Sequence, residues 1–172
     1  MSESSLSLTL ADEAATATLG TALADALLCQ REAIASSGAM IGLTGDLGSG
    51  KTTLARALLR RVGVTGPVKS PTFALLEPYE VSRLHFYHFD FYRFQNPREF
   101  LEAGFSEYFR PGAICLVEWP ERAGKDLPPA DLTICLRALP AGRCATIGAN
   151  TEIGERCLNH LRTFRSPARG DA

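Results

Sequence analysis

The sequence lacks an excess of charge of either sign. Its 18 lysines and arginines are balanced by 19 aspartates and glutamates, which leaves a formal net charge of -1 at pH 7. Proteins that bind nucleic acid tightly by themselves usually carry an excess of Lys and Arg on one face. The charge balance therefore argues against independent, high-affinity binding to nucleic acid and leaves room only for a local basic patch.

Long apolar segments are also missing. No uninterrupted apolar run reaches the length of about 18 residues that a membrane-spanning helix needs. The N-terminus has no basic segment followed by an apolar stretch, which is the pattern of a secretory signal. The sequence thus predicts no secretion and no membrane span, and we expect a cytoplasmic protein.

The cysteines lack paired spacing. The five cysteines are odd in number, and none forms a C-x-x-C pair: Cys29, Cys115, Cys135, Cys144 and Cys157. This pattern predicts reduced thiols rather than a disulfide framework or a metal site. Cys115 and Cys135 lie in apolar, strand-like runs, where a thiol is expected to act as a small hydrophobic residue.

The composition is that of an ordinary globular protein. With 172 residues, 45% hydrophobic and 22% charged, the chain is long enough for a full α/β core. We expect a single domain over residues 1–165, followed by a polar C-terminal tail at 166–172. No internal repeat or low-complexity segment divides the chain.

A glycine-rich motif dominates the pattern of the chain. Residues 45–52 match G-x-x-x-x-G-K-[ST], the phosphate-binding loop. A short apolar run, Met40–Thr44, precedes it, and an amphipathic helical pattern that ends at Gly63 follows. This order of strand, loop and helix favours a nucleotide site over a glycine turn without a ligand. The predicted nucleotide contacts are Gly45, Asp46, Leu47, Gly48, Ser49, Gly50, Lys51, Thr52 and Thr53.

The residue types of this motif have defined chemical tasks. Glycines let successive backbone N–H groups curl around a phosphate, and the N-terminus of the next helix adds its positive dipole end. Lys51 is expected to contact the β- and γ-phosphates of the nucleotide. Thr52 is expected to offer its hydroxyl to the accompanying magnesium ion.

Two predicted strands each deliver one acidic residue. The aromatic run Leu84–Asp90 ends in a carboxylate that must be paired, hydrated or bound to metal, because burial alone is too costly. The apolar run Ala113–Trp119 contains Glu118, which either faces a metal at the carboxyl edge of a parallel sheet or faces solvent. His85 and His88 fall on opposite faces of a strand, which disfavours a metal site made from both.

Between the loop helix and these strands lies a Ser-Pro-Thr segment. Ser70 and Thr72 carry hydroxyls that could sense a γ-phosphate or its metal, and an ordinary Ser-Pro turn is an equally good interpretation. The remaining expected elements are strands at Leu6–Leu10, Ala74–Leu76, Leu132–Leu136 and Ala145–Ala149, a turn at Pro78–Ser82, and helices from Asp12 to about Ile34 and over Thr151–Phe164.

Four blocks in this order resemble the TsaE family of small phosphate-loop ATPases. The resemblance covers about Asp12 to Arg143 and rests on residues 45–53, on Val68–Phe73 with Glu77–Tyr79, on Tyr87–Arg93 and on Ile114–Pro120. It implies a three-layer α/β fold around a mostly parallel central sheet, with ATP and Mg²⁺ at the loop. By the family pattern, Thr52 and Glu118 bind the metal and Asp90 is needed for hydrolysis. A Gly-Arg pair is also typical of the family; Gly142-Arg143 matches it in a turn-rich stretch, and the resemblance adds Arg143 to the expected nucleotide contacts.

The resemblance also implies a pathway. Proteins of this family serve the synthesis of threonylcarbamoyladenosine in tRNA, together with TsaD and TsaB. A slow, partner-regulated ATPase with Lys51, Asp90 and Glu118 as its catalytic residues is therefore expected, which meets tRNA mainly through its partners.

Two other classes of nucleotide-binding protein share a phosphate-binding loop. A GTP-binding switch would carry N-K-x-D and D-x-x-G motifs, and neither occurs in the sequence. A small-molecule kinase shares the loop and the fold, and it remains the alternative, although no arginine-bearing lid is recognisable.

Overall fold

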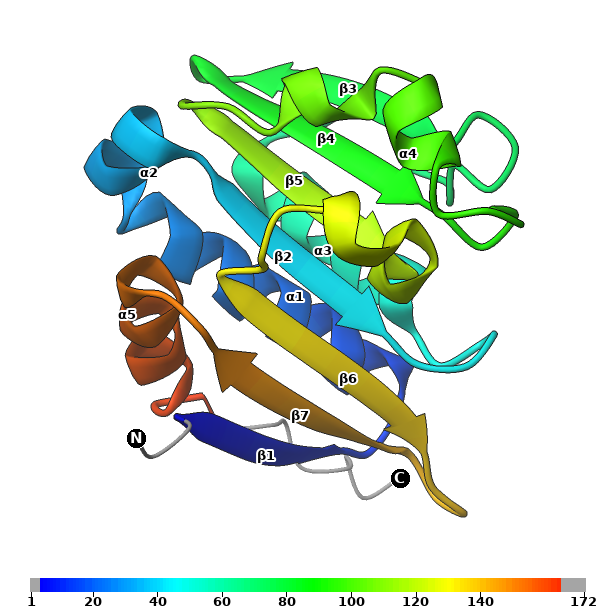
Figure 1. Cartoon of the computed structure of the whole chain (residues 1–172). Helices are drawn as coiled ribbons and strands as arrows, with labels where there is room; N and C mark the ends of the chain where they lie inside the picture. The colour runs from blue at the N-terminus through cyan, green and yellow to red at the C-terminus, as the bar shows by residue number, and fades with distance from the viewer. Residues whose placement is uncertain (1–3, 165–172) are drawn as a thin grey trace.

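The computed structural model describes residues 4–164 and builds them around one mixed sheet (Figure 1). In this part of the chain the sheet has seven strands in the order β1-β7-β6-β2-β5-β4-β3. The strands are β1 (Ser5–Leu10), β2 (Ala39–Thr44), β3 (Leu76–Val81), β4 (Leu84–Asp90), β5 (Ala113–Glu118), β6 (Leu132–Ala138) and β7 (Arg143–Ala149). The helices are α1 (Glu13–Leu28), α2 (Arg31–Ser37), α3 (Lys51–Val62), α4 (Glu99–Glu102) and α5 (Glu152–Leu161), with 3-10 helices η1 (Phe105–Tyr108) and η2 (Pro120–Asp126). The predicted tail at 166–172 lies outside the described residues.

The centre of the sheet is parallel, as the sequence predicted. Strands β6, β2, β5 and β4 run in the same direction, whereas β1, β7 and β3 pair antiparallel at the two sides. Strands β2 and β5 are buried almost throughout, which explains their continuous apolar sequences. The carboxyl ends of the parallel strands therefore meet at one edge, the edge at which the glycine-rich loop follows β2.

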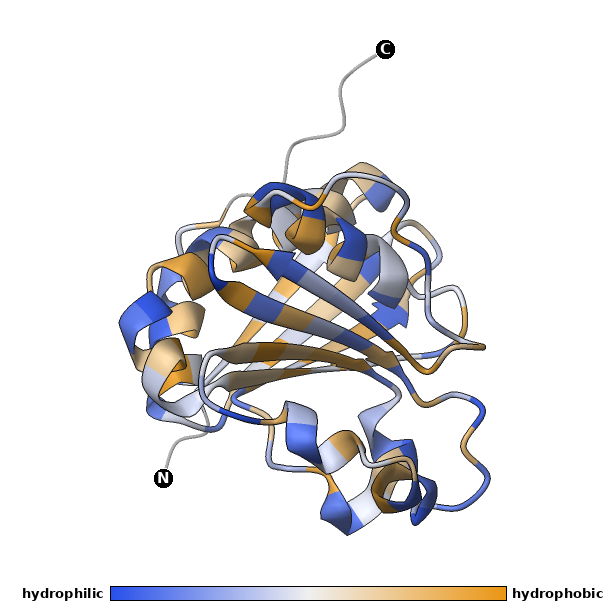
Figure 2. Ribbon diagram, turned by 90° about the horizontal axis from the view of Figure 1, so that it is seen from above, coloured by the Kyte–Doolittle hydropathy of each residue, from blue (hydrophilic) through white to orange (hydrophobic). Residues whose placement is uncertain are grey.

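Helices cover the two faces of the sheet unequally. One face packs against α1, α3 and α5 in a core that includes Leu23, Leu58 and Leu158. The other face packs against α4, η1 and η2 through an aromatic cluster that includes Phe89, Phe91 and Phe100. Seen from above, the sheet lies between these two layers (Figure 2). The predicted three-layer α/β fold is confirmed, and no described helix is long and apolar enough to cross a membrane.

The N-terminal helix is shorter than the sequence predicted. Asp12 caps its N-terminus, because the Asp12 side chain accepts a hydrogen bond from the backbone N–H of Ala15 at 2.8 Å. The helix does not continue to Ile34: Gln30 N–H bonds the carbonyl of Leu27, which tightens the last turn. Gln30 leaves the helical region at φ -102° and ψ 18°, and the chain restarts as α2.

A second expectation, the turn at Pro78–Ser82, is wrong. Strand β3 runs through this segment, and Pro78 pairs with Tyr87 of β4. A proline is tolerated here because β3 lies at the edge of the sheet, where a missing N–H costs no ladder bond on the open side. The reversal instead occurs at Ser82 and Arg83, which both adopt positive φ angles of 51° and 67°.

The cysteines follow the sheet geometry. All five are free thiols, as predicted. Cys115 is buried, and burial raises its pKa to about 12. Cys135 lies in a strand, as expected, but its side chain is exposed because β6 alternates between the core and a sheet face that the helices leave open. A small thiol at that position therefore says little about burial.

Candidate functional site

The glycine loop, residues 45–52, connects β2 to the first turn of α3. Gly45 and Gly50 adopt φ angles of 132° and 108°, which side-chain-bearing residues rarely reach. A Cβ at Gly45 would lie 2.2 Å from the carbonyl oxygen of Leu136, and one at Gly50 would lie 2.0 Å from Nη1 of Arg143. Backbone conformation therefore requires glycine at both positions. Close approach adds a second requirement only at Gly45, where the neighbouring atom belongs to the backbone, because the side chain of Arg143 can move away from Gly50.

Lys51 begins α3 and is held beneath the loop. Its side chain is buried, and Nζ donates hydrogen bonds to the carbonyls of Gly45 at 2.6 Å and Asp46 at 2.8 Å. Nζ also lies 4.4 Å from the centroid of the Trp119 ring. Burial lowers the pKa of Lys51, although the carboxylates of Glu118 and Asp90 act in the opposite direction. Gly45 and Asp46 thus serve the site through their carbonyls.

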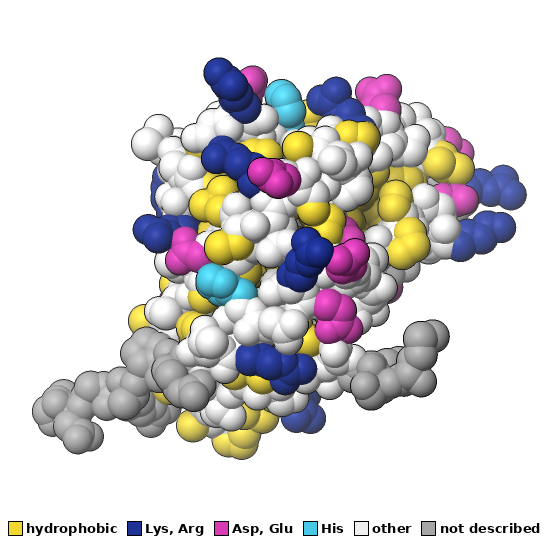
Figure 3. Space-filling view, turned by 90° about the vertical axis from the view of Figure 1, so that its left-hand side faces the viewer, with side chains coloured by type: hydrophobic (Ala, Val, Ile, Leu, Met, Phe, Trp, Pro, Cys, Tyr) yellow, Lys and Arg dark blue, Asp and Glu magenta, His cyan; other side chains and the backbone are white. Residues whose placement is uncertain are grey.

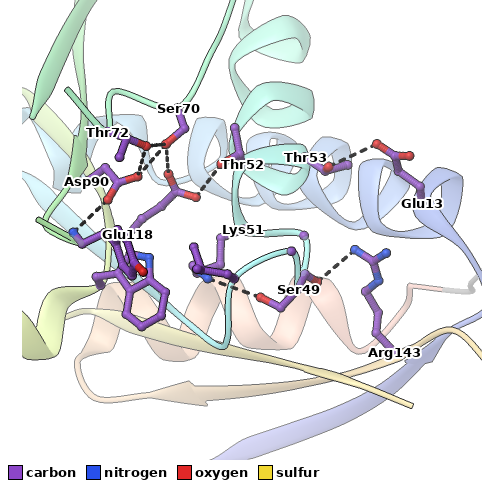
Figure 4. A pocket seen from close by; sticks show the side chains of 15 residues that line it. Glu13, Ser49, Lys51, Thr52, Thr53, Ser70, Thr72, Asp90, Glu118 and Arg143 are labelled. Carbon is purple, nitrogen blue, oxygen red and sulfur yellow. Dashed lines mark hydrogen bonds between the residues drawn. The ribbon is translucent and has the colours of Figure 1, made fainter. Parts of the chain in front are cut away.

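Two buried carboxylates lie beside this lysine. Asp90 and Glu118 end the neighbouring parallel strands β4 and β5, where they are register partners. Their exposed fractions are only 4% and 1%. The hydroxyl of Thr52, one residue into α3, donates to Oε1 of Glu118 at 2.8 Å (Figure 4). The solvent-facing alternative for Glu118 is excluded, and both predicted acids reach the same place.

The Ser-Pro-Thr segment closes over the carboxylates. Ser70 Oγ donates to Oδ2 of Asp90 at 2.5 Å and also lies 3.3 Å from Oε2 of Glu118. Thr72 Oγ1 donates to the same oxygen of Asp90 at 3.2 Å. The two hydroxyls are 3.0 Å apart (Figure 4). This geometry favours the sensing interpretation of the segment over an ordinary turn.

His88 is a site residue that the sequence reasoning missed. It is fully buried, and its Nε2 lies 3.2 Å from Oε2 of Glu118. The sequence argument correctly placed His85 and His88 on opposite faces but considered only a metal held by both. His88 and Asp90 are two residues apart and therefore share a strand face. That spacing was the available signal.

Hydrogen bonding sets the charge state of Glu118. Burial alone raises the pKa of this carboxyl, but hydrogen bonds from His88 and Thr52 and the positive charge of Lys51 outweigh burial. The pKa of Glu118 therefore lies below its ordinary value, and the residue is a carboxylate at neutral pH. An ionised acid in this position can bind a cation.

Arg143 reaches the glycine loop from β7, which lies two positions away from β2 in the sheet. It begins β7, and its Nη1 donates to the carbonyl of Ser49 at 2.9 Å. The Gly-Arg pair that sequence placed in a turn thus reaches the glycine loop. Glu13, at the start of α1, was not predicted; it accepts a hydrogen bond from the hydroxyl of Thr53 at 3.3 Å. Position in the sequence gave no signal for this residue.

These side chains line one open hollow of about 410 Å³, which we call the glycine-loop pocket. Its lining residues are Glu13, Leu47, Gly48, Ser49, Gly50, Lys51, Thr52, Thr53, Ser70, Thr72, Asp90, Tyr92, Glu118, Trp119 and Arg143. The predicted catalytic residues and the hydroxyl-bearing segment all belong to it, as Figure 4 shows. Its size and its charged, hydroxyl-rich wall suit a polyphosphate ligand.

The donor set fits a hard cation that also binds phosphate oxygens. Carboxylate and hydroxyl oxygens of Glu118 and Thr52 are the ligand types that Mg²⁺ prefers, usually with one or two protein carboxylates, water and substrate phosphates. Within residues 4–164, no group of three or more His, Cys, Asp and Glu side chains is arranged to hold a metal by itself. The oxygens of Glu118 and Thr52 therefore suit a Mg²⁺ ion whose other ligands are water and phosphate.

The fold and this loop define a class of protein: a single-sheet α/β protein with a P-loop-like fold. Comparison with a solved structure agrees, since the crystal structure of Bacillus subtilis YdiB matches 94% of this chain and 97% of that chain with a TM-score of 0.75 and 28% sequence identity.

Sequence comparison identifies the family. Residues 10–144 match the family described as "Threonylcarbamoyl adenosine biosynthesis protein TsaE". Among curated relatives, the TsaE protein of Haemophilus influenzae is 40% identical over 120 residues, which are 70% of this chain and 76% of the relative. That of Bacillus subtilis is 39% identical over 105 residues, 61% of this chain and 65% of the relative. The chain belongs to the TsaE family of tRNA threonylcarbamoyladenosine biosynthesis proteins.

Proposed function

We propose that this protein binds ATP with Mg²⁺, hydrolyses the ATP, and acts through this cycle on the TsaB–TsaD complex in the cytoplasm. The observation that carries the proposal is the convergence of Lys51, Thr52, Asp90 and Glu118 on one pocket at the glycine loop. Family membership supports the proposed pathway, and the residues that line the pocket support the proposed chemistry.

Each side chain has a task in this proposal. Lys51 binds β- and γ-phosphate oxygens with an ammonium that burial has already stripped of water. Thr52 and Glu118 hold Mg²⁺, which when bound neutralises charge that develops on the phosphates. The loop N–H groups and Arg143 add further contacts to the polyphosphate. The pocket thereby fixes the nucleotide before any chemistry begins.

Asp90 is the residue assigned to the attacking water. Its Oδ2 faces the hydroxyls of Ser70 and Thr72, and its Oδ1 accepts the backbone N–H of Tyr92 at 2.9 Å. A carboxylate fixed on both oxygens can accept a hydrogen bond from water and orient it toward a γ-phosphate. Ser70 and Thr72 are then well placed to exchange their bonds to Asp90 for bonds to the nucleotide.

The arginine content of the pocket supports dependence on partners. Among the described residues, Arg143 is the one arginine that lines the pocket, and it is already bonded to the loop carbonyl of Ser49. An arginine that reaches the transferred phosphoryl is worth about 10³ to 10⁵ in rate. We therefore expect slow hydrolysis by the isolated chain and a changed rate with TsaB and TsaD.

The surface charges fit contact with tRNA through partners. Figure 3 shows the side opposite the glycine loop, where basic and acidic side chains alternate without a continuous basic area in the described part of that face. With a net charge of -1, such a surface offers little to a polyanion.

Hydrolysis of ATP labelled at the γ-phosphate tests the proposal. The protein is incubated with Mg²⁺ and labelled ATP, alone and with TsaB and TsaD, in the presence and absence of a mixture of small metabolites. We expect the label in inorganic phosphate and a rate that the partners alter. Label transferred to a small acceptor would instead identify a kinase, and no release under any condition would refute the ATPase assignment.

A further inference from the structure

His88 makes a buried contact to which the proposed ATPase mechanism gives no task. Its ring is fully buried, and Nδ1 has no hydrogen-bond partner among the described residues. Leaving a buried polar atom unpaired costs about 1 to 3 kcal/mol. An apolar side chain would avoid this cost in a strand whose neighbouring residues on the same face, Leu84 and Phe86, belong to the core. The presence of an imidazole at this position therefore indicates a role in the pocket.

The strand register supplies the geometry for that reason. His88 is the register partner of Leu116, and Asp90 is the register partner of Glu118. His88 is thus a diagonal neighbour of Glu118 on the face of the sheet that meets α3. A carboxylate has no hydrogen to give, so the proton in the contact between Nε2 and Oε2 belongs to the histidine.

The two oxygens of Glu118 consequently have different surroundings. Oε2 is held by His88 at 3.2 Å and lies 3.3 Å from the hydroxyl of Ser70. Oε1 meets the hydroxyl of Thr52 at 2.8 Å, on the side of the glycine loop. A donor fixed behind Oε2 prevents the carboxylate from rotating and keeps Oε1 beside Thr52. The hydroxyl of Ser70 cannot take the place of this donor, because it has a single hydrogen and donates it to Asp90.

We propose that His88 is a positioning residue for the metal-binding carboxylate: its Nε2–H holds Oε2 of Glu118 and thereby aims Oε1 at the place where Thr52 meets Mg²⁺. This inference rests on the proposed function. Removing an outer-shell partner of this kind typically lowers metal affinity about 10- to 100-fold.

The experiment separates nucleotide binding from the metal requirement. The full chain and its variants are titrated with ATP in EDTA and then, at saturating ATP, with MgCl₂, while thermal stabilisation and Trp119 fluorescence report binding. His88→Gln keeps a donor near the position of Nε2. His88→Leu removes it, and His88→Asn places its donor near Nδ1, too far back to reach Glu118. His85→Leu on the opposite face of the strand is the control.

We expect His88→Leu and His88→Asn to need about 10- to 100-fold more Mg²⁺ for half-maximal response, with an unchanged affinity for ATP in EDTA. His88→Gln and His85→Leu should stay near wild type. Should His88→Leu fail to fold, the contrast between Gln and Asn decides the matter. An equal Mg²⁺ requirement in all folded variants would overturn the role of His88, whereas a wild-type protein that binds no ATP would overturn the proposed function itself.

Discussion

At the scale of single residues, several polar side chains of the pocket are bonded on more than one side. Asp90 shows this most clearly: one oxygen takes the backbone N–H of Tyr92, and the other takes the hydroxyls of Ser70 and Thr72. These contacts fix the carboxylate at the end of β4, as the proposed role of orienting a water molecule requires. The contacts also predict what a conservative change at this position will do.

Asp90→Asn should fold and bind ATP normally but hydrolyse it about 10²- to 10⁴-fold more slowly, because the amide keeps the shape and loses the acceptor strength of a carboxylate. Single-turnover hydrolysis and calorimetric ATP binding would be measured on the same preparation. An unchanged turnover would reduce Asp90 to a structural residue, and lost ATP binding would place it in the nucleotide site instead.

The sequence identified Lys51, Thr52, Asp90 and Glu118 because their motifs are local, or because a carboxylate follows an apolar run. It could not identify His88 as a partner of Glu118. That contact depends on the register between β4 and β5, which no local pattern specifies. Glu13 was missed for a similar reason, since only the packing of α1 against α3 brings it to Thr53.

At the scale of elements, the segment that carries Ser70 and Thr72 is tied to the glycine-loop helix. Arg56 of α3 donates from Nε to the carbonyl of Val68 at 2.9 Å, and Val68 is buried in the core. The helix that carries Lys51 thus also anchors the segment whose hydroxyls meet Asp90. The hydrogen bond from Arg56 therefore connects the helix of the proposed nucleotide site to the Ser-Pro-Thr segment.

Arg56→Ala should lower the turnover number about tenfold while ATP affinity stays near that of the wild type. A hydrogen bond from a charged donor is worth about 1.5 to 3 kcal/mol, and its loss loosens the segment without touching the loop. Steady-state kinetics would measure both constants. Arg61→Ala is the matched control, since Arg61 pairs with Asp25 on the surface of α1. Equal turnover in both variants would show that the tether is irrelevant.

Packing between α1 and α3 gives a second element-scale prediction. Gly20 lies inside α1, where glycine is less favourable than alanine by about 1 kcal/mol. In the structure, a Cβ at Gly20 would lie 2.4 Å from the carbonyl oxygen of Leu54 and 3.0 Å from Cβ of Ala57. The glycine therefore lets the two helices approach where α3 leaves the glycine loop.

Gly20→Ala should lower the free energy of unfolding by about 1 to 3 kcal/mol, because the steric cost exceeds the gain of about 1 kcal/mol in helix propensity. Urea unfolding followed by circular dichroism would measure the change. Gly148→Ala, whose Cβ would meet open space, should have a much smaller effect. A Gly20→Ala protein that is as stable as wild type would contradict the close contact.

The expected layers and central strands were confirmed. The wrong predictions concern segments whose structure depends on contacts with neighbouring elements. The sequence predicted a turn at Pro78, because it does not reveal that β3 lies at the edge of the sheet, where a proline is tolerated. The break between α1 and α2 was missed because no Gly or Pro marks it. The exposure of Cys135 could not be predicted, because it depends on which part of the sheet the helices leave uncovered.

At the scale of the whole molecule, the proposed function makes this chain an ATPase that depends on partner proteins. We expect immobilised protein to retain TsaB and TsaD from a bacterial lysate to different extents with ATP and without nucleotide. Asp90→Asn, which should bind ATP without hydrolysing it, would hold the ATP-dependent state. Retention of neither protein by the wild type under any nucleotide condition would separate this chain from the proposed complex.

The central claim is that the glycine-loop pocket binds Mg²⁺ and ATP through Lys51, and calorimetric titration of ATP in the presence of Mg²⁺ tests it most directly. Wild-type protein and Lys125→Ala, which changes an exposed lysine away from the pocket, should bind ATP with equal affinity. Lys51→Ala should give no measurable binding heat, because the pocket loses the ammonium that contacts the phosphates, while its circular dichroism spectrum stays that of the wild type. Binding of ATP by folded Lys51→Ala with wild-type affinity would contradict the account.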